Sequence, residues 1–448
     1  MIKDRQTIAL DRLPREYVDW LTKPFGRFLR IEATAGAFLL LCAAAALIIS
    51  NSPWAHSFAS AWDMRIGLHI GTWEFARSTK GWINDGLMTL FFFLVALELK
   101  RELVLGELNN PRMAALSIAA ALGGMFVPAA LYLVLQWGQP GQHGWGTVMA
   151  TDTAFVIGCL ALLGSRIPQS LRVFMLSLAI VDDIGAILVV AIGYGHDVAW
   201  GPLAAGVLGV VIVRAMGLLG VRSIPLYFIA GGAIWLAVDA SGIHATITGV
   251  VLGLLTPARR WVSDERLYAI LDRVVAHPAG DASSADTKDR QTLQLAEIAA
   301  RETLSPVERL EIALHPWVGF VVMPLFALAN AGLTLSSGDL VDAVTLAIFL
   351  GFTLGKPIGV LTFSWLALRS GIATRPPDLG WGLIAGGGLL AGIGFTMALF
   401  IANLAFDPAL IDSAKLGIFL ASIVSAVAGV ALLTWRSPRQ QSGSATRV

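Results

Sequence analysis

Charged side chains are scarce in this sequence of 448 residues. Only 14% of the residues are Asp, Glu, Lys or Arg, whereas 56% are hydrophobic and the mean hydropathy is +0.71. Soluble domains usually contain roughly 25% charged residues, because a folded surface in water needs polar side chains. The composition therefore argues against a soluble protein, and the net charge of +1 argues against a nucleic-acid partner.

Cysteines and polar linkers are also few. The two cysteines, Cys42 and Cys159, lie inside apolar runs, so we interpret them as small core residues rather than a disulfide or a metal site. The 46 glycines are scattered through apolar runs, which is typical of helices that pack closely in lipid. The first apolar run, near Ala33, follows a charged segment and precedes many similar runs, so we interpret it as a membrane span and not as a cleavable signal peptide.

The apolar runs predict an all-α polytopic membrane protein with about 12 transmembrane helices. A span needs roughly 20 apolar residues, and no alternation of period two suggests a β-barrel. We expect a transmembrane domain over 33–436, preceded by a cytoplasmic extension (1–32) and followed by a cytoplasmic tail (437–448). A long, partly disordered cytoplasmic loop is expected at 257–316. The twelve runs are 33–50, 82–99, 113–136, 145–164, 171–195, 200–220, 224–240, 243–256, 317–336, 341–368, 381–405 and 413–435.

Basic residues predict the orientation of these spans. With both termini in the cytoplasm, all but five of the 32 Lys and Arg residues lie inside, as the positive-inside rule requires. The exceptions are Lys356, which lies within a span, and the outer residues Arg65, Arg77, Lys80 and Lys415.

Four ionisable residues lie near the middle of predicted spans: Asp152, Asp182, Asp183 and Lys356. Each costs about 2.5–3.5 kcal/mol at a helix centre on insertion scales, so intramembrane charges are by default interpreted as functional sites. The sequence therefore predicts a polar site inside the membrane.

Asp182 and Asp183 are adjacent, in LAIVDDIGAI. Neighbours on a helix point about 100° apart, so both can border one cavity. Two carboxylates about 5 Å apart repel by roughly 3 kcal/mol at an effective dielectric near 20, so the pair is expected to retain a proton near neutral pH and to titrate as a unit. A small hard cation would relieve the repulsion and displace protons; alternatively, the pair is structural and bonded to neighbouring helices.

Two predicted spans carry signs of an interruption. Thr151 and Asp152 are poor helix residues in the fourth span, and Gly392, Gly394 and Thr396 occupy the corresponding place in the eleventh. Spans 3–5 and 10–12 would then be inverted repeats with two broken helices that cross at mid-membrane. Asp152 could offset the positive helix ends and Lys356 the negative ones; alternatively, Lys356 forms an ion pair with Asp182 or Asp183, or is merely structural.

Eight motifs in this order resemble the bacterial NhaA-type sodium/proton antiporters, from about Phe28 to Trp435. They are WINDGLMTLFFFLVALELKREL from Trp82, ATDTAF from Ala150, LAIVDDIGAI from Leu178, SGIHATITGV from Ser241, LHPWV from Leu314, FALANAG from Phe326, GKPIG from Gly355 and GIGFTM from Gly392. The resemblance implies an inner-membrane transporter, not an enzyme, that exchanges Na⁺ or Li⁺ for H⁺ by alternating access without a cofactor. It implies electrogenic, pH-regulated exchange that serves sodium and pH homeostasis and salt tolerance.

The resemblance also implies roles for individual residues. Asp182 and Asp183 would bind the cation and exchange the protons, with Thr151 and Asp152 at one break, Lys356 facing them, and Gly394 at the other break. Asp85 would lie in the outward access region, and five residues belong to motifs associated with the pH response: Glu98, Glu102, His244, Glu311 and His315. The alternative, purely structural interpretations are an interfacial charged cluster for Glu98 and Glu102, a helix cap for His244, and a helix anchor for Asp85.

Two rival functions are compatible with membrane aspartates. An intramembrane aspartyl protease needs its two aspartates on different helices, whereas Asp182 and Asp183 are sequential and no GxGD sequence occurs. A proton-coupled carrier of an organic solute needs several further polar or aromatic groups at mid-membrane. The expected partners are therefore sodium, protons and the lipid bilayer, and a homodimer is also compatible with the resemblance.

Overall fold

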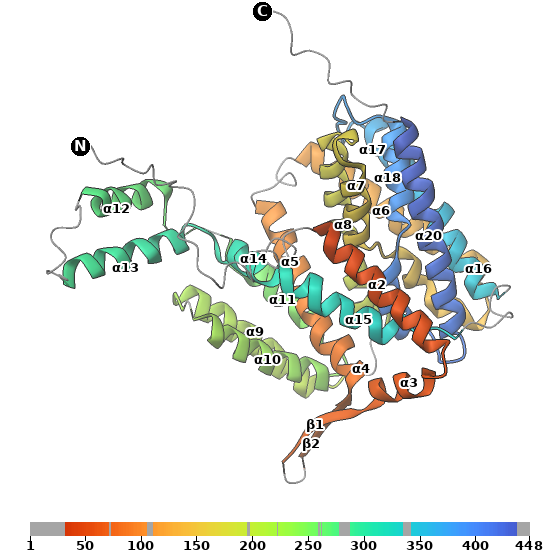
Figure 1. The fold of residues 1–448 in the computed structure, drawn as a ribbon, viewed down its shortest axis with the longest axis horizontal. Helices are drawn as coiled ribbons and strands as arrows, with labels where there is room; N and C mark the ends of the chain where they lie inside the picture. The colour runs from red at the N-terminus through yellow and green to blue at the C-terminus, as the bar shows by residue number, and fades with distance from the viewer. Residues whose placement is uncertain are drawn as a thin grey trace, which may run out of the picture.

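The computed structural model describes residues 32–70, 73–104, 111–194, 198–221, 223–258, 260, 262–276, 287–334 and 342–436. Helices make up nearly all of the regular structure in these residues (Figure 1). The predicted tail, the predicted amino-terminal extension up to residue 31 and the polar stretch 277–286 lie outside the described residues.

Seven helical segments are long and apolar enough to cross a membrane without a sharp bend. Three of them include a π-helical turn (η1, η5 and η7), at which the helix continues. The seven are α4–η1–α5 (Thr79–Gly81, Trp82–Leu87, Met88–Val104), α6 (Pro111–Leu135), α8 (Gln169–Gly193), α9 (Trp200–Leu218), α14–η5–α15 (Pro306–Trp317, Val318–Val322, Met323–Asn330), α16–η7–α17 (Ala343–Leu350, Gly351–Gly355, Lys356–Arg369) and α20 (Ile411–Arg436).

Three further helix pairs pass the same test together but are bent at a short break. They are α2 with α3 (Glu32–Ser50, Ala55–Asp63; 116°), η3 with α7 (Pro140–Met149, Thr153–Leu163; 43°) and α18 with α19 (Trp381–Ala391, Phe395–Ala405; 46°). The runs predicted at 224–240 and 243–256 contain the shorter helices α10 (Ile224–Ala240) and α11 (Ile247–Leu255). The described residues therefore contain seven uninterrupted spans, or ten with the bent pairs, and the count of twelve stays a prediction.

Both interruptions predicted from the sequence are present, as short non-helical segments between two helices. The segment before Asp152 is a ten-residue 3₁₀ helix, η3, which is unusual because such runs seldom exceed three or four residues. Ala150 and Asp152 have extended backbone angles, and the next helix starts at Thr153. In the second pair, α18 ends at Ala391 and α19 starts at Phe395, so Gly392 and Gly394 lie between them.

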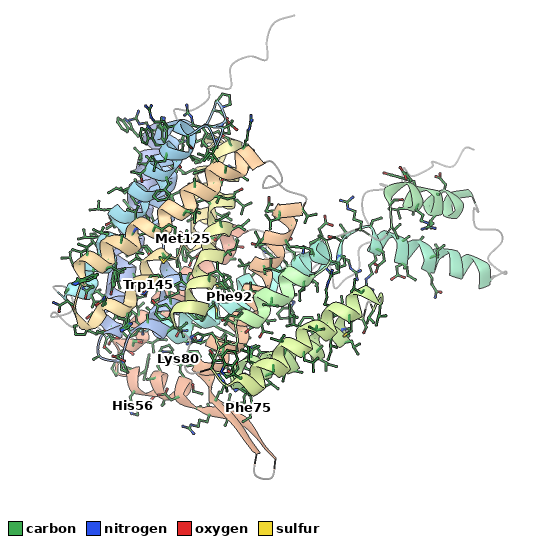
Figure 2. The ribbon with its side chains drawn as sticks, turned by 180° about the vertical axis from the view of Figure 1, so that it is seen from behind. His56, Phe75, Lys80, Phe92, Met125 and Trp145 are labelled. Carbon is green, nitrogen blue, oxygen red and sulfur yellow. The ribbon has the colours of Figure 1, made fainter. Side chains whose placement is uncertain are left out.

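A β-hairpin departs from the predicted all-α fold. Strands β1 (Arg65–Ile70) and β2 (Trp73–Ser78) pair antiparallel, with Arg65 opposite Ser78, and project from the helices (Figure 1). Trp82 anchors the root of the hairpin: its indole N–H donates to the Ile66 carbonyl at 2.8 Å, and its ring packs edge-on against Phe75. Phe75 lies at the same root in Figure 2. Hydrogen bonds between two short strands, rather than an apolar run, create this element.

The long connection predicted at 257–316 also differs from expectation, because it contains helices. Helices α12 (Asp264–Ala276) and α13 (Thr287–Glu302) lie side by side away from the main body (Figure 1). Helix α14 starts at Pro306 rather than near 317, behind a capping box in which Ser305 and Glu308 bond each other's backbone N–H groups. The charges of this first segment hid it from a search for apolar runs, although a capping box is a sequence signal for a helix start.

Apolar side chains cover much of the outer surface. Only 11% of the apolar stretch in α9 is buried, and its exposed side chains include Val207, Leu208, Val211 and Ile212. Soluble proteins rarely expose a continuous apolar surface of this kind, so this face of α9 is suited to contact with lipid.

Helices α6 and α17 cross at unusually short range because glycines meet at the crossing. A Cβ atom at Gly359 would lie 2.0 Å from the carbonyl oxygen of Gly123, and one at Gly355 would lie 2.7 Å from the Cα atom of Pro128. Close glycine-mediated contact is a common way for membrane helices to associate. The crossing fixes the start of α17, where Lys356 lies.

Gly359→Ala is expected to destabilise the protein. The added methyl group would collide with the Gly123 backbone, so α6 and α17 must separate, and overpacking of this kind costs about 1–3 kcal/mol. The measurement is thermal unfolding of the purified protein in detergent. Gly232→Ala in α10 is the control, because apart from the local helix backbone no atom lies within 4 Å of a Cβ at that position; equal unfolding temperatures for the two variants would contradict the expectation.

Candidate functional site

The adjacent carboxylates lie in the middle of α8 and are almost completely buried. Asp182 is 1% exposed and Asp183 is 3% exposed. One oxygen of each carboxylate has a partner, whereas the Oδ1 atoms of both are buried and have none within the described residues. Buried carboxylate oxygens without partners are costly, so this site is suited to a bound cation or to protons.

Lys356 forms an ion pair with Asp182. Its Nζ atom lies 2.6 Å from Asp182 Oδ2, and both side chains are 1% exposed. The ammonium group also donates to the Thr151 hydroxyl. Of the alternatives considered for Lys356, the structure therefore places it directly on one of the two aspartates.

Asp183 has a different hydrogen-bond partner from Asp182. Its Oδ2 atom accepts a hydrogen bond from the Thr153 hydroxyl at 3.1 Å, and within the described residues no ion pair involves it. The two aspartates thus have different environments, as the 100° step between helix neighbours allows. Carboxylate and hydroxyl oxygens are the donors preferred by small hard cations. Na⁺ would be a transported substrate here. Among the described residues, no group of three His, Cys, Asp or Glu side chains could hold a resident metal ion.

Asp152 joins the two broken helix pairs at their positive ends. It is the N-cap of α7, where Oδ1 accepts from the Phe155 N–H at 3.3 Å. Its Oδ2 atom accepts from the Thr396 N–H at 3.0 Å and from the Thr396 hydroxyl. Its backbone N–H donates to the Ile393 carbonyl at 2.7 Å. One carboxylate therefore faces the N-termini of α7 and α19, where a negative charge is favourable.

A short chain of hydrogen bonds links the break to the ion pair. Thr151 donates its hydroxyl to the carbonyl of Ala391 at 3.0 Å, at the end of α18, and accepts from Lys356. Lys356 thus reaches the carbonyl end of α18 through Thr151 rather than directly. Gly392 and Gly394 have no room for a side chain, because a Cβ would lie 2.6 Å from Ser425 Oγ at the first position and 2.3 Å from the Phe352 ring at the second.

Asp152→Ala is expected to destabilise both broken helices and to lower transport. Loss of an N-cap costs about 0.5–2 kcal/mol per helix, and this carboxylate serves two helix ends. Asp152→Asn should have a smaller effect, because its single carbonyl oxygen can still serve one of them. Thermal unfolding and transport rate measure both variants; an alanine variant as stable as wild type would mean that the two N-termini find other acceptors.

Two other groups of predicted residues lie apart from this site. Asp85, in η1, forms an ion pair with Arg77 at the end of β2, and Arg77 also pairs with Asp239 in α10. His244 contacts the Tyr194 carbonyl through Nε2 at 2.9 Å. The sequence analysis gave neither Arg77 nor Asp239 a role at a site, because the two residues are far apart in the chain and meet only through the fold.

The remaining predicted residues belong to α5 and α14. Arg101 pairs with Glu102 on its own helix and with Glu311 on α14, so these two acidic residues share the guanidinium group of Arg101. Glu98 is half-buried on α5, and His315 is half-buried near the end of α14. The structure thus brings Glu102 and Glu311 together around Arg101.

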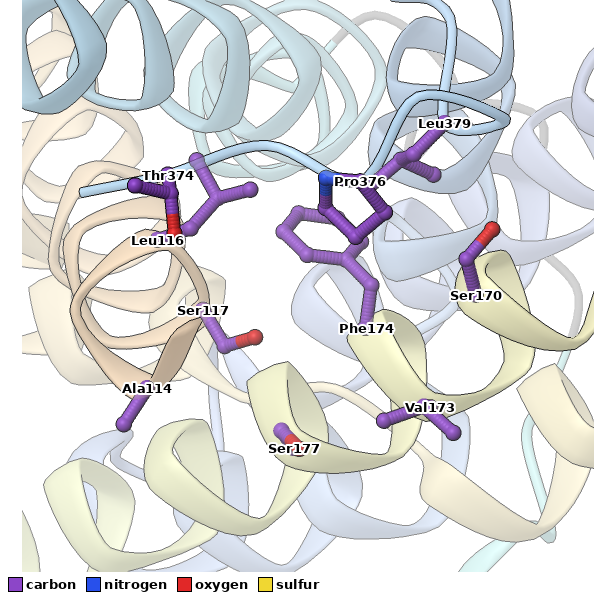
Figure 3. Close-up of a pocket in the computed structure, with 10 residues that line it drawn as sticks. All are labelled: Ala114, Leu116, Ser117, Ser170, Val173, Phe174, Ser177, Thr374, Pro376 and Leu379. Carbon is purple, nitrogen blue, oxygen red and sulfur yellow. The ribbon is translucent and has the colours of Figure 1, made fainter. Parts of the chain in front are cut away.

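A small cavity of about 30 Å³ lies elsewhere, between α6, α8 and the segment that precedes α18 (Figure 3). Its walls include Ser117, Ser177 and Phe174, and it contains no ionisable side chain. A volume of this size holds about one water molecule, so the cavity is too small and too weakly polar to be the candidate site.

Comparisons with known proteins decide the family. The sequence profile of the family described as Na⁺/H⁺ antiporter 1 matches residues 26–433. The chain belongs to this Na⁺/H⁺ antiporter family. It is 63% identical over 430 residues to the protein named Na(+)/H(+) antiporter NhaA 1 of Acidiphilium cryptum (strain JF-5), with 96% of each chain covered.

Two further relatives span most of this antiporter. The Na(+)/H(+) antiporter NhaA of Rhizobium meliloti (strain 1021) is 61% identical over 426 residues, which cover 95% of this chain and 98% of the relative. The Na(+)/H(+) antiporter NhaA 2 of Vibrio vulnificus (strain CMCP6) is 58% identical over 439 residues, with 98% of each chain covered. The family resemblance inferred from the sequence motifs is confirmed, and the family is one of transporters rather than enzymes.

Proposed function

We propose that this antiporter exchanges intracellular Na⁺ or Li⁺ for external H⁺ at Asp182 and Asp183. The observation that supports this site best is the pair of adjacent, buried carboxylates, each with an oxygen that has no partner in the described residues. Only one of the two is held by a lysine. Protons and a small cation can therefore compete for the same oxygens, and this competition couples their movements.

In the exchange cycle, protons and the cation occupy the same two carboxylates alternately. When the site is open to the cytoplasm, Na⁺ binds the carboxylates of Asp182 and Asp183 and displaces their protons. The loaded site then opens outward and releases Na⁺, after which external protons bind and drive the return. If both carboxylates change protonation, or one of them together with Lys356, about two protons enter for each Na⁺ that leaves, and the exchange is electrogenic.

The membrane arrangement is part of the same proposal. Twelve spans would place both termini in the cytoplasm of a bacterium and the transmembrane domain, 33–436, in its inner membrane. Spans 3–5 and 10–12 would be inverted repeats whose breaks cross at mid-membrane. Support comes from the similar bends of 43° and 46° in the two broken pairs and from the hydrogen bond between Asp152 and Ile393 at the breaks.

We further assign regulation and access to the groups outside the exchange site. Asp85, with its partner Arg77, would form part of the outward access region. The pH response would involve Glu98, Glu102, His244, Glu311 and His315, in a protein that serves sodium and pH homeostasis. The ion pairs of Arg101 with Glu102 and Glu311 support this assignment. Protonation of Glu311 would weaken a contact between α5 and α14, and protonation of Glu102 would weaken the neighbouring contact within α5.

Everted membrane vesicles with an acid interior and a fluorescent ΔpH dye provide the test. Addition of NaCl or LiCl, but not KCl, is expected to restore fluorescence as protons leave in exchange for the cation. No response between pH 6.5 and 9 would refute sodium/proton exchange and would leave a proton-coupled carrier of an organic solute as the next function to test. The control vesicles come from the same host, lacking its own sodium/proton antiporters, without the protein.

A further inference from the structure

Helix α20 packs along both halves of the broken pair α18–α19. A Cβ at Gly386 in α18 would lie 2.6 Å from Leu433 of α20, and one at Gly429 of α20 would lie 2.6 Å from Leu390 in α18. Phe419 of α20 packs against Phe395, the first residue of α19, at a centroid distance of 5.5 Å. Helix α20 therefore contacts the chain on both sides of the break.

Ser422 of α20 binds the start of α19 directly. The backbone N–H of Phe395 donates to Ser422 Oγ at 3.3 Å, and the serine is 7% exposed. The next N–H, that of Thr396, donates to the Asp152 carboxylate. Gly394, the N-cap residue of α19, has no side chain that could serve either group. The first two N–H groups of α19 are thus satisfied by two different elements, a neutral hydroxyl and a carboxylate.

We propose that Ser422 is a positioning residue for cation exchange, an assignment that rests on the proposed function. By occupying the Phe395 N–H, Ser422 keeps the Asp152 carboxylate on Thr396, one residue further along. Asp152 precedes α7 and follows Thr151, which contacts Lys356, and Lys356 pairs with Asp182. Ser422 therefore fixes the register of the break at which these groups meet.

The physical reason is the cost of an unsatisfied buried N–H group. Without the Ser422 hydroxyl, the Phe395 N–H has no acceptor in a buried environment, and such a group is driven to find one. Its strongest neighbouring acceptor is the Asp152 carboxylate, because hydrogen bonds to charged groups are the stronger ones. A carboxylate drawn toward Phe395 would move Thr151 with it, and through Thr151 would disturb Lys356 and Asp182.

Ser425 provides a matched comparison one turn away. It lies on the same helix, is 1% exposed, and faces the same break at Gly392. Unlike Ser422, its hydroxyl has no hydrogen-bond partner in the described residues. Removal of an unbonded hydroxyl should leave the break unchanged, so the two serines differ in the one property that matters here.

The experiment compares Ser422→Ala and Ser425→Ala in reconstituted vesicles and by hydrogen exchange. Ser422→Ala is expected to raise the KM for Na⁺ about two- to tenfold, in line with the loss of one buried hydrogen bond, with little change in the maximal rate. It should also accelerate amide exchange in the peptide that contains Phe395. Ser425→Ala should stay within twofold of wild type in both measurements. If Ser422→Ala does not fold, Ser422→Thr and Ser422→Val replace it, because they share a shape and differ in the hydroxyl.

The outcomes separate this inference from the proposed function. A wild-type protein that exchanges Na⁺, together with Ser422→Ala and Ser425→Ala variants of equal KM, would overturn the role of Ser422 alone. The same holds if Ser422→Val matches Ser422→Thr. A wild-type protein without Na⁺-dependent exchange would overturn the proposed function, whereas the amide-exchange comparison would still decide whether Ser422 holds the start of α19.

Discussion

Asp183→Asn is expected to abolish Na⁺- and Li⁺-dependent proton movement in everted vesicles. The substitution keeps the size of the side chain and its hydrogen bond from Thr153, but removes the negative charge and the ability to release a proton. A neutral amide can neither attract a cation strongly in a buried site nor exchange protons for it. We expect a loss of at least 100-fold in the rate, with normal folding, because within the described residues no ion pair depends on Asp183.

Asp378→Asn is the control, because Asp378 is an exposed aspartate that bonds only the Ser170 hydroxyl among the described residues. It should retain wild-type exchange. The same two variants can be compared for growth in high salt, in a host that lacks other sodium pumps. Wild-type salt tolerance with Asp183→Asn would be incompatible with cation and proton exchange at this carboxylate.

Lys356→Met is expected to destabilise the protein severely. It removes one partner of an ion pair whose side chains are both 1% exposed, and breaking a buried pair from one side costs about 3–5 kcal/mol. The carboxylate of Asp182 would remain buried with neither the lysine nor another cation beside it. Thermal unfolding in detergent, with retention on size-exclusion chromatography, measures the loss.

The double variant Asp182→Asn/Lys356→Met should recover most of that stability. With both charges removed, no uncompensated charge remains in the core, and replacement of a whole buried pair is often neutral. Recovery by the double variant together with a large loss in the single one would identify the unpaired charge as the cause. A double variant as unstable as Lys356→Met would instead indicate that the lysine side chain matters through its packing or its bond to Thr151.

Much of the candidate site could be predicted from the sequence because charges in apolar runs are conspicuous. Asp152, Asp182, Asp183 and Lys356 stand out against a background of 14% charged residues, and their cost in lipid marks them as functional. Likewise, Thr151 with Asp152 and the glycines at 392 and 394 indicated where two helices would be interrupted. Residues with ordinary surroundings in sequence, such as Ser422 and Arg77, gave no such signal.

Other features of the fold were not visible because they depend on local pairing or on distant partners. The hairpin β1–β2 is short, and its anchor is the contact of Trp82 with Ile66 and Phe75. Helix α14 starts eleven residues before the predicted ninth run, since charged residues such as Glu308 and Glu311 lie in its first turns. A search for apolar length alone detects neither feature.

The sequence by itself determined that the chain belongs in a lipid bilayer, that it is helical, and which charged residues form the candidate site. These follow from composition and from the free energy of placing each residue in lipid, which act residue by residue. Only the tertiary structure decided which aspartate Lys356 neutralises and which helix ends share Asp152. Asp182 and Asp183 differ by a 100° turn on one helix, so the choice depends on where the glycine crossing of α6 and α17 places the lysine, and that is a property of packing between distant segments.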